Sequence, residues 1–599
     1  MLHNGLCRSS SNAIFSLPPS IIALCWLIMT HAPLTDTDLA AIMERINEGA
    51  LYLTRKLDEP SSNTVFNLLS PFPINLEDKV INTIARCLRA TEIDLTCSMM
   101  TERKVQLVRT QKNLKSLSLG YFSKLEEYHL KKECRKDCEV YQRTEQNGNG
   151  ENGDAGSSNG HEKKIAYIID LPKLLKDMLQ EESINLQSLD LSPEPTGTES
   201  NGHDEQFQDG WALLVGQMLP DLTNLSLRQR ILTFEEFGHI CIQFSQLETL
   251  DLTNTALESL EGISQLRNLK TLRIGCLKLI SLDDLFNLEN LRNLSFESTW
   301  WSCQCCRFGN GIDLYLESNR RMKSLVHLDL SMTTVTDKVV KRFVEEHPSL
   351  KSLGICGTKT QTIVYPNLQV YHCRTIQGAI TSLDFYTAQK NSWMVDMVID
   401  TLYDLLRQRL INRATNEELK AAMKTLNNTL EAYGHLKRVM RHGTYCYKEI
   451  LKSTLLEVFD IADIQKMLHI QIANIVRHMK QLETYSPIYN EMVESWELLS
   501  NQDLLFQTPG LDFNKICFLG FRIVEITEAG DGIDLPHLEV LEILMDHIDK
   551  RAVVFRKTLK MKNVFAALRR IEELAESDSM VWRAAKNVGE FNFDIHFDL

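Results

Sequence analysis

The chain has no surplus of basic residues, since 65 Lys and Arg stand against 79 Asp and Glu in 599 residues and give a net charge of -14. Proteins that grip phosphate backbones depend on a basic field, so this acidity disfavours nucleic-acid binding as the main function. Cysteine is also scarce, with 15 residues at irregular spacing, which is too few for a disulfide scaffold. We therefore expect mostly reduced thiols and a location in the cytoplasm or nucleus.

Long apolar runs are missing as well, apart from Ser20 to Met29 (SIIALCWLIM). As a helix this run reaches only about 15 Å, half of a bilayer core, so it cannot span a membrane and we expect no membrane partner. The alternative is a secretory signal peptide, with Asn224 and Asn293 as glycosylation acceptors. Both asparagines lie inside a repeat, next to positions that must be buried, which disfavours the secreted alternative.

Sequence motifs for catalysis and cofactor binding are absent. There is no phosphate-binding Gly-Lys-Ser/Thr loop, no HExxH zinc motif, no Gly-x-Ser-x-Gly hydrolase motif and no set of protein-kinase motifs. Gly148, Gly150 and Gly153 form a GxGxxG, but no strand precedes it and no helix follows it. Cys303, Cys305 and Cys306 are too close together for zinc and are interpreted as loop thiols. We expect a non-catalytic protein without cofactor or metal, although a cysteine nucleophile with a distant histidine stays open.

A repeat dominates the middle of the chain. The template Leu-x-x-Leu-x-Leu begins at Leu114, Leu186, Leu222, Leu247, Leu269, Leu291, Leu325 and Leu350, with a weaker copy at Ala90. Steps of 25, 22 and 22 residues between Leu222 and Leu291 are typical of leucine-rich repeats. The sequence therefore predicts an α/β leucine-rich-repeat solenoid over residues 89–373. A stretch near 131–164, rich in Gly, Asn and Glu, is predicted to be a disordered insertion.

Beyond about residue 374 the pattern changes to long helical faces, such as Leu419/Ala422/Met423/Leu426/Leu430. Helices of this length in series predict an all-α armadillo/HEAT-like solenoid over residues 374–599. Residues 16–88 precede the repeats and are predicted to hold two short binding segments and a helical cap. Two solenoids in one chain offer extended surfaces for protein partners, which is typical of an adaptor.

The first short segment is the apolar run at Ser20. On a helix Ile21, Leu24, Cys25 and Ile28 fall at i, i+3, i+4 and i+7 and form one stripe, preceded by Pro18 and Pro19. From composition alone this helix caps the open end of the first repeat. It is, however, similar to an elongin-binding box, in which Ser/Thr-Leu opens a helix and a Cys follows five residues after the Ser/Thr. Ile21 replaces the usual Leu, a change that conserves volume.

The second segment, Phe72-Pro73-Ile74-Asn75-Leu76, continues through Val80 and resembles a cullin box of the cullin-two type. Together, the two boxes and the repeats that follow resemble the Zyg-eleven family, with its Zer-one branch, of substrate receptors for cullin-two ubiquitin ligases. Leu328-Asp-Leu-Ser331 through Pro348-Ser-Leu350 looks like the family's last repeats. The resemblance implies elongin C, elongin B, cullin-two with its RING subunit, and protein substrates as partners. It implies no enzyme activity in this chain.

One family property is not expected here. Family members read N-terminal glycine in the groove of a longer armadillo region, and the stretch Trp582-Arg-Ala-Ala-Lys-Asn587 does not reproduce the family's Trp-Asn-Leu-Thr-Asp sequence. We therefore expect no strong preference for peptides that begin with glycine. The alternative from another functional class is a leucine-rich-repeat scaffold with no ligase link.

Overall fold

A computed structural model of the chain describes residues 57–69, 86–122, 125–130, 167–179, 185–193, 205–298, 310–361, 364–408, 414–453 and 458–478. These residues divide between two compact units. The repeat unit comprises Lys56–Leu353 with Thr358–Thr362, and the helical unit includes Gly354–Gly357 and the described residues from 364 onward.

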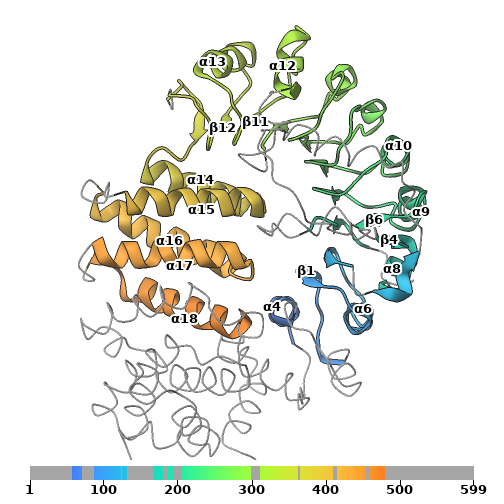
Figure 1. The fold of residues 1–599 in the computed structure, drawn as a ribbon, viewed down its shortest axis with the longest axis horizontal. Helices are drawn as coiled ribbons and strands as arrows, with labels where there is room; N and C mark the ends of the chain where they lie inside the picture. Colours follow the sequence, from blue (N-terminus) through green and yellow to red (C-terminus); the bar gives the residue numbers. More distant parts are fainter. Residues whose placement is uncertain are drawn as a thin grey trace, which may run out of the picture. The chain divides into compact units, whose positions relative to one another are not determined.

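The repeat unit is built on a parallel sheet with strand order β1-β2-β5-β7-β8-β9-β10-β11-β12 (Figure 1). Its strands are β1 (Glu92–Met99), β2 (Ser116–Tyr121), β5 (Ser188–Asp190), β7 (Asn224–Ser226), β8 (Thr249–Asp251), β9 (Thr271–Arg273), β10 (Asn293–Ser295), β11 (His327–Asp329) and β12 (Ser352–Gly354). From β2 to β11 the register is constant, because the central leucines pair from strand to strand, for example Leu225 with Leu250 and Leu272 with Leu294. The β1–β2 pair has one irregularity, between Leu95 and Met99. Sequential parallel strands in one register are the structure that the leucine template predicts.

The strand leucines point into the core. Every apolar position of the template, from Ala90 to Ile355, is at most 8% exposed. Figure 1 shows α6 (Glu102–Arg109), α8 (Leu171–Met178), α9 (Trp211–Met218), α10 (Phe234–Gln243), α12 (Asn310–Glu317) and α13 (Asp337–Glu346) on the outer side of the sheet. α4 (Glu59–Leu69) contacts β1 at the first end of the sheet. The short helices η1 (Glu126–Tyr128), η3 (Ile263–Gln265) and η4 (Asp283–Asn287) follow β2, β8 and β9 along the chain. The predicted leucine-rich-repeat solenoid is confirmed in these residues.

Five of the repeats turn away from their strand through a left-handed residue. The second residue after the last apolar position of the template has a φ of 62° at Gln229, 59° at Asn254, 58° at Cys276, 61° at Met332 and 66° at Gly357. The backbone ladder holds this conformation, since the N–H groups of Gln229 and Asn254 donate to the next repeat at 2.9 Å in both cases. Non-glycine residues occupy such a φ at an energetic cost, which the repeated ladder offsets.

A second, small sheet was not predicted. It has the order β3-β4-β6, formed by β3 (His129–Leu130), β4 (Tyr167–Ile169) and β6 (Glu205–Phe207). β3 pairs antiparallel with β4, whereas β4 pairs parallel with β6. These strands have two or three residues each and lie where the repeat period is interrupted, so the template carries no signal for them.

The helical unit begins with β13 (Gln369–Tyr371) and continues with α14 (Ile376–Ala388), α15 (Ser392–Arg407), α16 (Asn416–Tyr433), α17 (Lys437–Ser453) and α18 (Ile461–His478). α15 lies against α14 and α17, and α16 lies against α14, α17 and α18. Thr415 and Glu418 form a reciprocal capping box at the start of α16. Gly443 lets α17 approach Leu430, whose side chain lies 2.5 Å from where a Cβ at 443 would be. A helical region is therefore present, and its armadillo/HEAT subtype stays a prediction.

Candidate functional site

The strand face opposite the leucines is polar. Because side chains alternate along a strand, the two positions that flank each central leucine share this face. The first column is Ser116, Ser188, Asn224, Thr249, Thr271, Asn293, His327 and Ser352, and the second is Ser118, Asp190, Ser226, Asp251, Arg273, Ser295 and Asp329. We call these two columns the polar strand face. Its residues come from neighbouring repeats in register, so it is a continuous surface of the kind that repeat proteins use for binding.

The second column also fixes the turn after each strand. Asp190, Asp251 and Asp329 each accept a hydrogen bond at 2.9 Å from the backbone N–H two residues later. Ser295 accepts the equivalent bond from Glu297 at 3.1 Å. Short acceptor side chains favour such local turns, which explains why Asp and Ser recur at this position. Most of this column is therefore structural as well as polar.

The centre of the strand face holds a buried group of charges, Arg228, Asp251, Arg273 and Glu297, which we call the central charge cluster. The Arg228 guanidinium donates to Asp251 at 3.2 Å through Nε and also pairs with Glu297. Arg273 Nη1 lies 3.6 Å from Asp251 Oδ2. The side chains of Arg228, Asp251 and Glu297 are 4%, 4% and 1% exposed. The two guanidinium groups thus neutralise two buried carboxylates, and Arg273, which is 17% exposed, is the member of the cluster that reaches solvent.

Burial and pairing act in opposite directions on these groups. Burial by itself would raise the pKa of Asp251, but Arg228, Arg273 and the bonds from Thr253 outweigh it and hold that pKa below its usual range. The nearby carboxyl of Asp190 has a raised pKa because burial outweighs its bonds with Ser192. At the edge of the cluster, burial and Arg273 lower the pKa of His327 to about 4. His327 is therefore neutral at pH 7 and shares a 2.8 Å hydrogen bond with Ser352.

A second buried arginine ties the repeats to the small sheet. Arg230 Nη1 donates to Glu205 at 3.0 Å, and Arg230 Nε donates to the Leu191 carbonyl at 2.6 Å. Its guanidinium carbon lies 5.2 Å from the Phe122 ring centroid and 5.5 Å from that of Phe207. Both distances suit a cation–π contact. This arginine occupies a position where leucine-rich repeats usually place asparagine, and its role here is structural.

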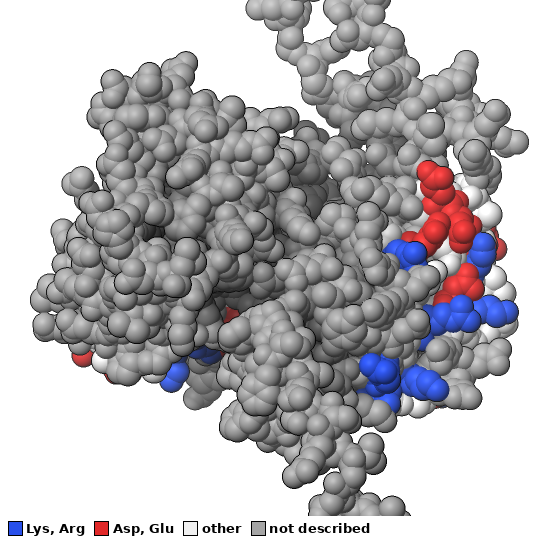
Figure 2. Space-filling view, turned by 90° about the horizontal axis from the view of Figure 1, so that it is seen from below, with Lys and Arg blue, Asp and Glu red and all other residues white. Residues whose placement is uncertain are grey.

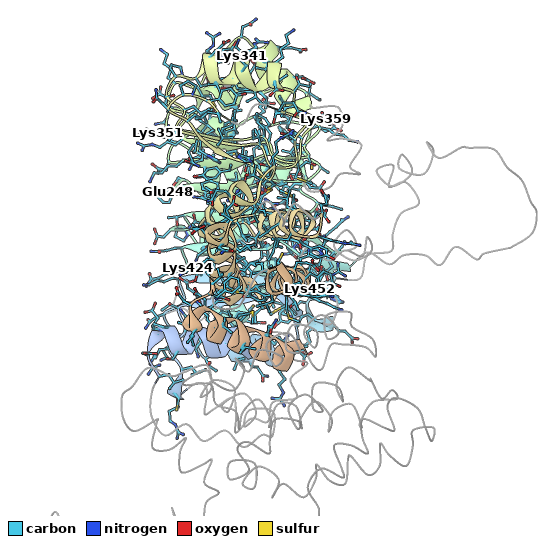
Figure 3. All side chains as sticks on the ribbon, turned by 90° about the vertical axis from the view of Figure 1, so that its left-hand side faces the viewer. Glu248, Lys341, Lys351, Lys359, Lys424 and Lys452 are labelled. Carbon is cyan, nitrogen blue, oxygen red and sulfur yellow. The ribbon has the colours of Figure 1, made fainter. Side chains whose placement is uncertain are left out.

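The rim of the strand face is solvated and carries mixed charge. The residue that follows the first leucine of each repeat belongs to this rim. These residues form the rim column Lys115, Gln187, Thr223, Glu248, Lys270, Arg292, Val326 and Lys351. Figure 3 shows Glu248 and Lys351 at the same side of the repeat unit, as their equivalent positions require. Lys270 pairs with Glu248 at 2.6 Å, with both side chains about half exposed. On the face drawn in Figure 2, the described residues likewise carry acidic and basic side chains side by side.

The helical unit holds a separate ionisable group between α15 and α17. Arg438 Nε lies 3.0 Å from Asp396 Oδ2, while His442 lies 3.5 Å from Asp396 and 3.5 Å from Asp400. Burial raises the pKa of Asp400 above its usual range, and His442 opposes that shift. These contacts join two packed helices. Asp396 and Asp400 belong to α15, and Arg438 and His442 belong to α17, so these ion pairs fasten the two helices together.

Two of the buried thiols are also poorly suited to nucleophilic chemistry. Burial raises the pKa of Cys241 to about 12 and raises that of Cys446 as well, so both are protonated at neutral pH. Among the residues that the structure describes, no group of three or more His, Cys, Asp or Glu side chains could hold a metal ion. No helix within those same ranges is long and apolar enough to cross a membrane.

The site residues predicted from the sequence lie outside the described residues. This holds for Ser20, Ile21, Leu24, Cys25 and Ile28 of the first box, and for Phe72, Pro73, Leu76 and Val80 of the second. The insertion near 131–164 and the thiols at 303–306 are also outside them, and all of these stay predictions. Conversely, sequence reasoning missed the polar strand face. Its signal was present, since nearly every position that flanks a central leucine is polar.

Comparison with known proteins gives one distant relative. No family model matches the chain. Gastrulation-defective protein 3 of Caenorhabditis elegans is 21% identical to it over 392 residues. The chain is a distant relative of that protein. The match covers 65% of this chain and 53% of the other, so the chain spans about half the length of the curated relative it matches.

Solved structures are similar only in part. Internalin C2 from Listeria monocytogenes has a TM-score of 0.21 and 19% identity, over 32% of this chain and 73% of its own. Internalin F from the same organism has a TM-score of 0.27 and 12% identity, over 58% of this chain and 92% of its own. At such scores the assignment of the fold rests on the strand register and the buried leucines described above.

Proposed function

We propose that the chain is the substrate-recognition subunit of a cullin-two RING ubiquitin ligase. In this proposal the first box binds elongin C, and with it elongin B, through Ser20, Ile21, Leu24, Cys25 and Ile28. The second box binds cullin-two with its RING subunit through Phe72, Pro73, Leu76 and Val80. The repeats hold a target protein, and ubiquitin transfer is promoted because the complex raises the effective concentration of the ubiquitin carrier near the target.

The observation that carries the proposal is the order of the segments: an elongin-type box, then a cullin-type box, then leucine-rich repeats. Each box is short and degenerate, but their order and spacing ahead of the repeats make the combination specific. The match to Gastrulation-defective protein 3 extends over 392 residues, so this order of segments is set within a chain that has a distant relative over most of its length. The polar strand face adds a surface suited to a protein target. A receptor of this kind works in the cytoplasm or nucleus.

The competing function is a repeat scaffold with no link to a ligase. In that case the apolar run from Ser20 to Met29 covers the open end of the first repeat, because an uncovered solenoid end exposes its core. The two functions make opposite predictions about a charge in this run. A scaffold that loses its cap unfolds, whereas a receptor that loses its box keeps its fold and loses only its partner.

The test is a pulldown of the tagged full-length chain from cell extract, probed for elongin C and cullin-two. Ile21→Asp with Cys25→Asp is expected to abolish elongin C capture, because a carboxylate forced into an apolar pocket costs several kcal/mol unless it is neutralised. Ile280→Asp is the matched control, since the same change at a side chain that is 74% exposed should leave capture intact.

Circular dichroism separates the outcomes. A folded double variant that still captures elongin C shows that the box assignment is wrong. A double variant whose far-UV signal is lost favours the cap and therefore the scaffold. A folded double variant without elongin C, beside an unaffected control, supports the receptor.

A further inference from the structure

The outer side of the repeat unit carries a rigid pair of helices, α9 and α10. The Glu236 carboxylate, from α10, accepts a hydrogen bond at 2.9 Å from the Ala212 N–H and another from the Gly210 N–H, so it caps the start of α9. Gly216 allows close packing, because a Cβ there would lie 2.4 Å from Gln243 Cβ. Thr233 caps α10 itself. A surface on these helices is therefore preorganised, which lowers the entropic cost of binding.

α10 exposes apolar side chains on the face that points away from the core. Phe237 and Ile240 are fully buried, whereas Phe234 is 53% exposed and Ile242 is 58% exposed. Gly238 lies between these two at four-residue spacing, and nothing lies within 4 Å of where its Cβ would be. Residues at i, i+4 and i+8 share one side of a helix. Phe234, Gly238 and Ile242 therefore form a ridge with a notch, which we call the α10 stripe.

The chain on both sides of the stripe carries acidic side chains. From Glu205 to Leu266 the only basic residues other than histidine are Arg228 and Arg230, which are 3% and 2% exposed and paired in the interior. The exposed acidic residues of the same range are Asp209, Asp221, Glu235, Glu258 and Glu261. Glu235 is next to Phe234 on α10 itself. α9 and η3 pack against α10, and along this stretch of the chain the exposed charged side chains are acidic until Arg267.

We propose that the α10 stripe docks an amphipathic helix of a partner protein that carries Leu-type side chains on one face and Lys or Arg on its flanks. Apolar side chains at helical spacing fit into the notch at Gly238, as ridges of one helix fit grooves of another. The exposed acidic residues on either side of the stripe along the chain attract the Lys and Arg flanks of the partner helix and set the orientation of that helix. A second copy of this chain is a poorer occupant, because it brings the same acidic residues and a net charge of -14.

The experiment uses the full-length chain and fluorescence anisotropy of two labelled synthetic peptides. The first is an 18-residue helix with Leu at every third or fourth position and Lys and Arg on the flanks. The second has the same Leu positions with Glu in place of Lys and Arg. The proposal expects micromolar binding of the basic peptide at low salt, weaker binding as salt rises, and no binding of the acidic peptide.

Variants place the binding on the stripe. Phe234→Ser with Ile242→Ser should lower the affinity for the basic peptide at least about tenfold, since two apolar contacts are lost. Glu235→Lys should also lower the affinity for the basic peptide, and the affinity should then change less with salt concentration. Ile280→Ser, at an exposed apolar residue of another repeat, is the matched control and should change nothing. All four substituted residues are exposed, so melting temperatures should stay close to wild type.

Four results overturn the proposal, three from the peptide titrations and one from sedimentation. The first is an absence of binding, and the second is equal binding of both peptides. The third is binding that Phe234→Ser with Ile242→Ser leaves unchanged, which shows a diffuse attraction to the acidic chain. Sedimentation at rising concentration decides about the second copy: a dimer that the same double variant dissolves assigns the stripe to self-association and also contradicts the proposal.

Discussion

Replacing Arg228 by alanine tests the central charge cluster. In the native repeats the Arg228 guanidinium lies between Asp251 and Glu297, whose side chains are 4% and 1% exposed. In the alanine variant Asp251 keeps Arg273, whose Nη1 lies 3.6 Å from its carboxylate, whereas Glu297 loses its ion pair with Arg228. Breaking a buried ion pair from one side costs about 3–5 kcal/mol, because a carboxylate then stays in the interior without its compensating charge.

The matched control is Lys270→Ala. Lys270 and Glu248 also form an ion pair across neighbouring repeats, at 2.6 Å, but their side chains are 51% and 46% exposed. Water and salt screen such a pair, so its removal should cost no more than about 1 kcal/mol. The two variants thus remove one basic side chain each from the same sheet and differ chiefly in burial.

Native-state hydrogen exchange, read by mass spectrometry on peptides from β7 to β10, measures the effect locally. This assay suits a chain of two units, for which one global unfolding free energy is not well defined. For Arg228→Ala we expect protection to fall roughly a hundredfold or more, and for Lys270→Ala less than about tenfold. Equal losses in the two variants would refute the reasoning that burial makes the cluster strong.

Three further predictions concern other positions. Gly275→Ala should destabilise the repeat unit by about 1–3 kcal/mol in a thermal melt, because a Cβ there would lie 1.6 Å from the Glu297 carbonyl oxygen and the backbone must shift; an unchanged melting temperature contradicts this. The pKa of His327 is lowered to about 4, so the folded state favours its neutral form. Stability should therefore fall as the pH drops from about 6.5 towards 4, by no more than about 3 kcal/mol, and His327→Gln should reduce that fall. Parallel stability profiles of the two proteins against pH would contradict this. Deleting residues 145–160 should change the melting temperature by no more than a few degrees, since loop closure entropy varies only logarithmically with length; a larger drop shows that the segment packs.

The repeat fold could be predicted because its determinants are local and periodic. An apolar residue, in most cases leucine, stands at the same three positions of every repeat and must be buried, and strands in register follow from stacking. The long helices from α14 onward were visible for a similar reason, since faces such as Leu419/Ala422/Met423 recur at helical spacing and are at most 2% exposed. In both cases one short window of sequence contains the physical signal.

The central charge cluster could not be predicted in the same way. Arg228 and Glu297 are separated by 69 residues, and neither lies at a position that the leucine template constrains. Their pairing depends on the stacking of several repeats, which brings equivalent positions together. Arg230 is similar, because its partner Glu205 belongs to a small sheet that lies outside the repeat period. Such contacts follow only from the three-dimensional register.

The central claim is that the two N-terminal boxes join the repeats to a ubiquitin ligase. Its most direct measurement is size-exclusion chromatography of the purified chain with purified elongin B/C and cullin-two, for wild type and for Pro73→Ala with Leu76→Asp. Our account predicts that wild type co-elutes with all partners, and that the variant keeps elongin B/C but loses cullin-two. Wild-type chain that elutes apart from elongin B/C and cullin-two contradicts the account and leaves the chain a repeat scaffold.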